Sequence, residues 1–244
     1  MKIQSINPYT EVVMREFELM GSGEADREIS NSRRAYMTWS DVPLSERAAC
    51  LRNLADHLRA EKRKYAEIMT REMGKPIREA VQEIEKCSWL CDYYAEHGEN
   101  YLKPEEVRTE SAKSYILFQP LGIVLAIMPW NFPFWQAFRF GIPAITSGNV
   151  VALKHASNVP LCALAIEDAF REAGFPDGVL KTLLIDARDA LKLIDEDKVD
   201  AVSLTGSNRA GEQVAELAGR RIKKCVLELG GSDPFIVLAD ADID

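Results

Sequence analysis

The second half of the chain alternates between short apolar runs and segments of helical periodicity, and this alternation constrains the fold more than any other feature. The apolar runs, expected as strands, lie at 122–128, 149–153, 179–185, 199–204 and 223–227. The segments expected as helices lie at about 134–147, 160–173, 188–195 and 208–219. Strands that alternate with helices pair in parallel through right-handed crossovers. The sequence therefore predicts an α/β fold with a doubly wound parallel sheet.

The first half is predicted to be helical. Apolar residues recur at three-, four- and seven-residue spacings through residues 44–73, with Arg, Lys and Glu between them, which indicates one amphipathic helix. Gly74-Lys-Pro76 is expected to end it. A second amphipathic helix is expected from Ile77 to Tyr94, and both apolar faces are expected to cover the sheet. Residues 107–119 fit neither pattern.

The charge pattern argues against two kinds of partner. The net charge is −8 and both signs are mixed along the chain, so there is no basic footprint for nucleic acid and no patch for a membrane surface. No apolar run reaches membrane-spanning length. Residues 1–8 have no apolar signal core, and we expect a cytoplasmic protein.

The five cysteines predict neither a metal site nor a disulfide framework. Cys87 and Cys91 are four residues apart on an expected helix, but the three histidines are scattered, so a zinc ion would lack its remaining ligands. We interpret these two as core thiols and expect no structural disulfide in this compartment.

Two polar residues stand in settings that suit catalysis. Glu228 lies in an apolar strand that runs into Gly230-Gly231, where desolvation would adapt a carboxylate to act as a base near neutral pH. Asn131 lies between Pro129 and Pro133, and a rigid amide donor stabilises an oxyanion without reorganisation. Each has an ordinary alternative. A glutamate at a strand end is commonly a surface or capping residue, and Pro-Trp-Asn-Phe-Pro alone is typical of a turn.

Residues 206–211, Gly-Ser-Asn-Arg-Ala-Gly, have the spacing of a phosphate loop, but Glu212-Gln213 stands where Lys-Ser or Lys-Thr would be needed. This excludes an ATP site, and the Gly-x-Gly-x-x-Gly dinucleotide fingerprint is absent. The expected strand-turn-helix setting still presents backbone N–H groups to a pyrophosphate. A plain helix start with Ser207 as its N-cap fits the same residues.

Five motifs follow one another along the chain: Pro129-Trp-Asn-Phe-Pro133, Gly148-Asn-Val-Val-Ala-Leu-Lys154, Ala173-Gly-Phe-Pro-Asp-Gly178, Leu204-Thr-Gly-Ser207 and Leu227-Glu-Leu-Gly-Gly231. In kind and order they resemble the signatures of the aldehyde dehydrogenase superfamily. The resemblance extends over essentially the whole chain. Lys154-His-Ala-Ser157 and residues 223–237 resemble succinate-semialdehyde dehydrogenases most.

The resemblance implies an NAD(P)-dependent oxidation of an aldehyde to a carboxylic acid, here succinate semialdehyde to succinate. A cysteine thiolate would attack the aldehyde, Asn131 would hold the oxyanion, and Glu228 would activate water after hydride transfer to the nicotinamide. The resemblance also favours pyrophosphate binding at residues 206–211. The residues that it implies for cofactor binding are Met128, Pro129, Trp130, Asn131, Lys154, Ser157, Gly206, Ser207 and Leu229.

The choice of cofactor is expected to depend on Ser157. In families of this type Lys154 reaches the adenine ribose, and an acid at the position of Ser157 would repel a 2′-phosphate. Here a hydroxyl stands beside Lys154 and His155, so NADP is expected, with NAD also usable. A lysine at a strand end is commonplace by itself.

Substrate contacts are expected on the helix that begins at Pro133. Trp135 and Arg139 are four residues apart and share a face with Phe132 and Gln136. The resemblance places the aldehyde entrance along this face, so we expect Trp135 to line it and Arg139 to clamp the distal carboxylate of a semialdehyde. Arg139 could instead stack on the rings or pair with a structural carboxylate.

The resemblance also divides the chain into residues 1–227, an NAD(P)-binding domain with an oligomerisation hairpin near 107–119, and residues 228–244, the start of a truncated catalytic domain. No cysteine stands in the context of the family's nucleophile, and Cys225 is expected to be a packed strand thiol. We therefore expect the 244-residue chain alone to be inactive and the full-length form to be a homo-oligomer. A stand-alone nucleotide-binding module and a non-enzymatic partner of an intact subunit remain as alternatives.

Overall fold

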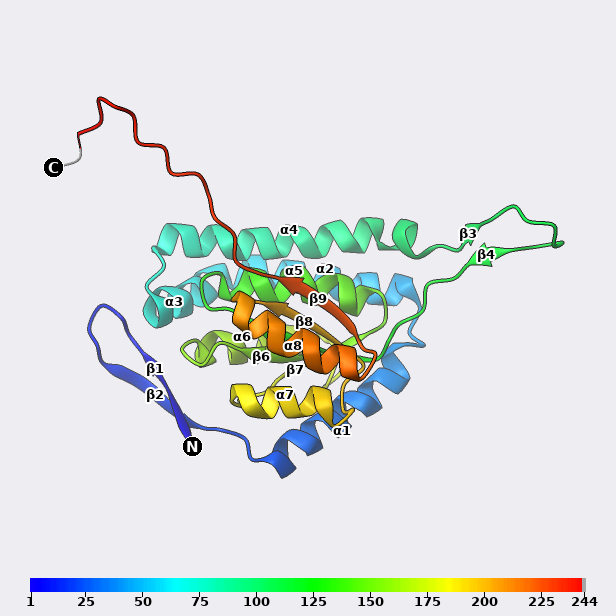
Figure 1. Cartoon of the computed structure of the whole chain (residues 1–244), viewed down its shortest axis with the longest axis horizontal. Coiled ribbons are helices and arrows are strands. Elements are labelled where there is room, and N and C mark those ends of the chain that lie inside the picture. The colour runs from blue at the N-terminus through cyan, green and yellow to red at the C-terminus, as the bar shows by residue number, and fades with distance from the viewer. Residues whose placement is uncertain (243–244) are drawn as a thin grey trace.

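A five-stranded parallel sheet forms the centre of the computed structural model, which describes residues 1–242 (Figure 1). The strand order is β7-β6-β5-β8-β9, and every neighbouring pair is parallel. The strands are β5 (Ile123–Met128), β6 (Val150–His155), β7 (Leu180–Thr182), β8 (Ala201–Thr205) and β9 (Lys224–Glu228). The doubly wound parallel sheet predicted from the sequence is confirmed.

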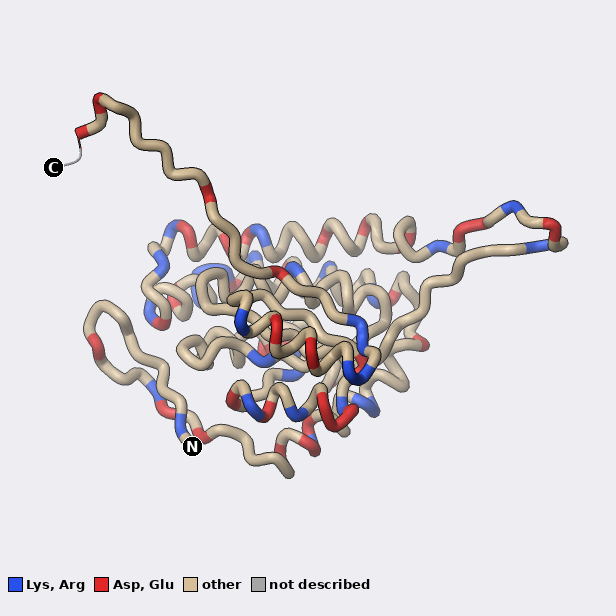
Figure 2. Tube along the Cα trace, viewed as in Figure 1, with Lys and Arg blue, Asp and Glu red and all other residues tan. Residues whose placement is uncertain are grey.

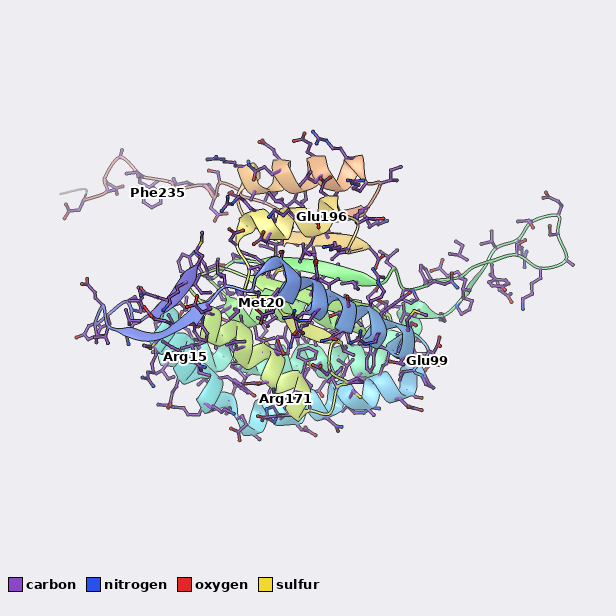
Figure 3. The ribbon with its side chains drawn as sticks, turned by 90° about the horizontal axis from the view of Figure 1, so that it is seen from below. Arg15, Met20, Glu99, Arg171, Glu196 and Phe235 are labelled. Atoms are coloured by element: carbon purple, nitrogen blue, oxygen red, sulfur yellow. The ribbon has the colours of Figure 1, made fainter. Side chains whose placement is uncertain are left out.

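The helices that connect these strands lie on both faces of the sheet. On one face α5 (Pro133–Thr146) packs against α6 (Pro160–Glu172), and on the other α7 (Ala187–Asp195) packs against α8 (Asn208–Arg220) (Figure 3). Proline in the first turn begins both α5 and α6, because its fixed φ suits that position and no backbone N–H is lost from the helix. All four helices match their predicted ranges closely.

The order of the strands defines where a ligand can bind. From β5 the chain moves to β6 and β7 and then returns to β8 on the other side of β5. The connection after β5 therefore runs toward one edge of the sheet, and the connection after β8 runs toward the other edge. In open α/β sheets ligands bind outside the carboxyl ends of the two strands where the connections separate in this way.

The first half of the chain forms a helical layer outside α5 and α6. Its helices are α2 (Leu44–Ala60), α3 (Lys62–Met73) and α4 (Ile77–Leu102). Helices α2 and α3 both pack on α4 and on α6, and α4 packs on α5. The expectation that these helices cover the sheet is wrong, because α5 and α6 already occupy that face.

The single helix predicted over residues 44–73 is interrupted at Glu61, whose φ is −101° and ψ is 13°. Leu58 and Tyr65, on either side, are both buried. The turn therefore changes the local backbone without removing apolar residues from the core, which is why apolar periodicity does not reveal it. Helix α1 (Ser22–Trp39) packs against β5, β6 and β7, and its Arg33 pairs with Asp200, which directly precedes β8, at 2.6 Å.

Two hairpins and the last described residues project from this body (Figure 1). The first hairpin, β1 (Lys2–Ile6) and β2 (Val13–Glu18), was not predicted; the second, β3 (Glu105–Glu106) and β4 (Tyr115–Ile116), contains most of residues 107–119. Its role in oligomerisation stays a prediction. Residues 229–242 leave the sheet after β9, and Phe235 among them is 93% exposed (Figure 3).

Charged residues of both signs are interspersed along the helices (Figure 2), in agreement with the mixed pattern in the sequence. No helix in residues 1–242 is long and apolar enough to cross a membrane. In the same described part of the chain, no group of three or more His, Cys, Asp or Glu side chains is placed to hold a metal ion.

Candidate nucleotide and catalytic site

Most of the predicted site residues meet at the carboxyl edge of the sheet. Asn131 follows β5, Lys154 lies near the end of β6, Gly206 and Ser207 follow β8, and Glu228 ends β9. Parallel strands bring their carboxyl ends to one edge, so residues far apart in the sequence become neighbours. Asn131 and Ser207 are exposed at this edge, as is Trp130, whereas Pro129 is half-buried and Met128 is buried.

An ion pair joins α5 to the end of β9. Nη2 of Arg139 donates to Oε2 of Glu228 at 2.7 Å and lies 3.5 Å from Oγ1 of Thr205, at the end of β8. Within residues 1–242 the Glu228 side chain is 54% exposed, so the described residues do not provide the desolvation that was predicted for it. The reason is that β9 is an edge strand and the chain beyond it turns outward. The carboxylate is therefore positioned by an arginine rather than by an apolar pocket.

The start of α8 suits an anionic ligand. Oγ of Ser207 accepts the N–H of Ala210 at 3.3 Å, and the Ser207 carbonyl oxygen accepts the N–H of Gly211 at 3.0 Å. The N–H groups of Asn208 and Arg209, at the first two helical positions, have no intrahelical acceptor. No acidic residue lies in this first turn.

The other three crossover helices begin against carboxylates. Glu83 accepts the N–H groups of the first turn of α5, Glu72 those of α6, and Asp186 caps α7. A carboxylate there neutralises the positive end of the helix dipole. Of the four crossover helices, all within the described residues, α8 alone starts without one. This difference supports the interpretation of residues 206–211 as a pyrophosphate site, although Ser207 is also an ordinary N-cap.

Gly206 and Leu229 border the same helix start. The N–H of Gly206 donates to the Glu228 carbonyl oxygen at 3.0 Å and so extends the ladder between β8 and β9. Leu229 packs over Gly211, where an added Cβ would come within 2.5 Å of a Leu229 methyl group. Contact of Gly206 and Leu229 with a cofactor stays a prediction.

Lys154 and Ser157 open onto different hollows. Lys154 lines a cavity of about 70 Å³ between α7 and α8, and burial lowers the pKa of its ammonium although Asp186 opposes that shift. Ser157 is exposed and borders a wider hollow of about 420 Å³ beside β1. Lys154, in β6, and Ser157, in the loop after β6, therefore do not share a pocket.

His155 is buried beneath the site instead of facing a phosphate. Its Nε2 lies 2.9 Å from the Pro133 carbonyl oxygen, and its Nδ1 accepts the N–H of Ala156 at 2.9 Å. Because Nδ1 accepts, Nε2 carries the proton and donates it to Pro133. Burial lowers the pKa of His155 to about 4, so the ring is neutral at pH 7. The expectation that His155 stands beside a 2′-phosphate is wrong.

We expect His155 to make the protein less stable as the pH falls from 6.5 to 4. Burial holds its pKa in the folded state at about 4, whereas an unfolded histidine titrates near 6.5. The unfolded chain therefore takes up a proton first, and stability that is fully present above pH 6.5 is lost progressively below it. Between pH 7 and pH 5, urea titrations should show a decline about 2 kcal/mol larger in the wild type than in His155→Gln. Equal declines would contradict a buried neutral histidine.

No cysteine in the described residues lies at this edge in an exposed setting. Burial raises the pKa of the Cys87, Cys91 and Cys162 thiols well above the ordinary value. Cys225 is half-buried within β9, and burial raises its pKa as well. The prediction that Cys87 and Cys91 are core thiols is confirmed. A reactive thiolate is favoured by exposure and a lowered pKa, and these thiols have neither.

Sequence reasoning missed Lys75 and Glu83, a buried ion pair that contacts residues 132–135, directly after Asn131. The sequence does contain a signal for this buried pair. Glu83 lies three residues after Ala80 and four before Cys87, on the same apolar face of α4, and a charged residue at a core position of an amphipathic helix is seldom left without a partner.

This combination of strand order, α8 start and polar residues at the carboxyl edge defines an α/β dinucleotide-binding domain. The model of the aldehyde dehydrogenase family matches residues 1–244, and the chain belongs to that family. The resemblance seen in the sequence motifs is confirmed.

Similar proteins are succinate-semialdehyde dehydrogenases. The chain is 48% identical to a "Probable succinate-semialdehyde dehydrogenase [NADP(+)]" of Synechocystis sp., covering 100% of this chain and 54% of that protein. It is 44% identical to the "Succinate semialdehyde dehydrogenase [NAD(P)+] Sad" of Escherichia coli, covering 98% and 52%. The crystal structure of succinic semialdehyde dehydrogenase from Streptococcus pyogenes in complex with NADP+ superposes with a TM-score of 0.92 at 40% identity, covering 98% and 53%. The chain thus spans about half the length of these relatives.

Proposed function

We propose that these residues form the dinucleotide-binding part of an NADP-dependent aldehyde dehydrogenase that oxidises succinate semialdehyde to succinate. The observation that carries the proposal is the meeting of Asn131, the acid-free start of α8 and the Arg139–Glu228 pair at one sheet edge. The relatives named above support the substrate and the cofactor. In this proposal residues 1–227 form the NAD(P)-binding domain, and residues 228–244 lead into a catalytic domain.

The residues present fit a dinucleotide. The start of α8 would hold the pyrophosphate, with Lys154 toward the adenine ribose and Trp130 and Leu229 bordering the cofactor. NADP or NAD, when bound, accepts the hydride of the aldehyde. Asn131 would donate to the oxyanion, and Glu228 would take a proton from the water that releases the acid. The attacking thiol would come from outside these residues, because none of the described cysteines is exposed at the site.

Arg139 has two proposed partners in this scheme. In the structure it pairs with Glu228, as the alternative of a carboxylate partner allowed. An ion pair as exposed as this one contributes only about 0–1 kcal/mol. A substrate carboxylate could therefore replace Glu228 as its partner, which would also leave Glu228 free to act on water. Trp135, one helical turn before Arg139, would line the approach.

The direct test is to assay the full-length protein that contains this chain. We expect NADPH formation from succinate semialdehyde, and we expect the 244-residue chain to bind NADP without turnover. A full-length protein that binds NADP but oxidises no aldehyde would favour a nucleotide-binding module without catalysis. Sedimentation of the full-length protein would test the proposed homo-oligomer, whose interface we place at the hairpin of β3 and β4.

Cofactor preference should respond to Ser157. We expect Ser157→Glu to shift the ratio of kcat/KM values toward NAD by at least about tenfold, because the added carboxylate repels a 2′-phosphate. The matched control is Asn158→Glu, which places the same charge on the next exposed residue. An unchanged NADP to NAD ratio in Ser157→Glu, measured from initial rates with each cofactor, would remove Ser157 from the cofactor site.

A further inference from the structure

A buried ion pair lies directly behind the segment that follows Asn131. Lys75, between α3 and α4, and Glu83 of α4 are 7% and 4% exposed. The Lys75 ammonium pairs with Oε2 of Glu83 and lies 3.6 Å from the centroid of the Phe132 ring. Oε1 of Glu83 accepts the N–H groups of Phe134 and Trp135, each at 2.9 Å.

A third side chain contacts the remaining residue of this segment. Nε2 of His155, on β6, donates to the Pro133 carbonyl oxygen at 2.9 Å. Residues 132–135 are therefore each held by one of three side chains, Lys75, Glu83 or His155, which we call the loop clamp. Lys75 and Glu83 belong to the outer helical layer and His155 belongs to β6, so the clamp ties the segment to both that layer and the sheet.

The clamp matters because Asn131 has little else to hold it. Asn131 is exposed, and within residues 1–242 its side chain makes no hydrogen bond to the protein. The direction of its amide therefore depends on the backbone that continues into residues 132–135. Oxyanion donors act through prior positioning, and a displacement of about 1 Å can lower a rate about 10²-fold.

We propose that Lys75, Glu83 and His155 are positioning residues that hold the Asn131 amide in place for the oxyanion. The inference rests on the proposed aldehyde oxidation and adds residues that do not touch the substrate. Glu83 acts through its acceptor oxygen on the N–H groups of α5, and Lys75 balances its buried charge, which would otherwise be strongly destabilising.

The test compares Glu83 with a matched glutamate on the same helix in the full-length protein. Glu85 lies two residues away, is exposed and pairs with Lys62 at 2.6 Å. We expect Glu83→Leu to lower kcat about 10²-fold while the KM for aldehyde and the Kd for NADP stay within about twofold, because only the position of the oxyanion donor changes. Glu85→Leu should change none of these values beyond about twofold.

Amide hydrogen exchange provides a readout that needs no activity. In Glu83→Leu the amides of Phe134 and Trp135 should exchange at least about tenfold faster, as expected for lost hydrogen bonds. The double variant Lys75→Met with Glu83→Gln removes both charges but keeps the acceptor oxygen. It should restore slow exchange at both amides and bring kcat to within about fivefold of the wild type.

Several results would overturn the proposal. One is a folded Glu83→Leu protein with faster exchange at residues 134 and 135 but wild-type kcat. A parallel loss of kcat, aldehyde binding and NADP binding would indicate general structural damage. A double variant as impaired as Glu83→Leu would show that the acceptor oxygen at position 83 is not what positions Asn131. If Glu83→Leu does not fold, kcat and amide exchange are compared instead between His155→Leu, which removes the N–H donor to Pro133, and His155→Gln, which retains one. A wild-type protein that oxidises no aldehyde would refute the proposed function. The exchange rates of the Phe134 and Trp135 amides would still test whether the loop clamp holds this segment.

Discussion

Replacing Glu228 with glutamine in the full-length protein is expected to preserve the first turnover and to slow later turnovers about 10²- to 10⁴-fold. Glutamine keeps an oxygen that can accept from Arg139, so the contact at 2.7 Å can persist. It cannot take a proton from water, so deacylation should stall. Stopped-flow absorbance of NADPH should show a burst followed by very slow turnover.

The matched control for this experiment is Glu216→Gln, an exposed glutamate of α8 that pairs with Arg220. It should leave both the burst and the steady-state rate unchanged. Loss of the burst together with turnover in Glu228→Gln would assign Glu228 to activation of the thiol or to structure instead of to water activation.

Replacing Arg139 with leucine is expected to raise the KM for succinate semialdehyde about 10- to 100-fold, as expected for the loss of a hydrogen bond between charged groups. Neutral aldehydes of similar length, such as butanal, should be oxidised with unchanged or lower KM. The measurement is a pair of kcat and KM values for the two aldehydes. Arg220→Leu, at an exposed arginine of α8 outside residues 206–211, is the control for loss of a positive charge.

Because Arg139 pairs with Glu228, a loss of activity on neutral aldehydes in Arg139→Leu would also be informative. Equal losses of kcat on charged and neutral aldehydes would show that Arg139 acts by holding Glu228, which is its partner in the structure. The assignment to succinate semialdehyde would then lose its main support among the residues of this chain, although the similarity to succinate-semialdehyde dehydrogenases would stand.

The strands of the central sheet and the helices that connect them followed closely from the sequence, whereas the hairpin of β1 and β2 and helix α1 were not predicted. The apolar run 122–128 and the helix 134–147 correspond to β5 and α5 almost residue for residue. These predictions depend on the period of apolar residues, which is a local property that buried strands and amphipathic helices share across folds. The interruption at Glu61 has no such signature, because Leu58 and Tyr65 keep helical spacing on either side of it.

The candidate site followed from the sequence only in part. The motifs placed Asn131, Ser207 and Glu228 after or at the ends of strands, and the parallel order of those strands makes their convergence predictable. The surroundings of each residue were not predictable. An apolar run has the same sequence pattern in a central strand and in an edge strand. The exposure of Glu228 on β9 could therefore not be predicted from the sequence.

The sequence by itself determined the parallel α/β sheet, the family and the positions of the polar residues at strand ends, because these depend on periodicity and on short contiguous motifs. Only the tertiary structure decided which side chains meet. It paired Arg139 with Glu228 and buried His155 beneath the site. It also placed Lys75 and Glu83 against residues 132–135. The physical reason is that burial and charge pairing depend on the packing of segments dozens of residues apart, and local apolar patterns do not specify which segments become neighbours.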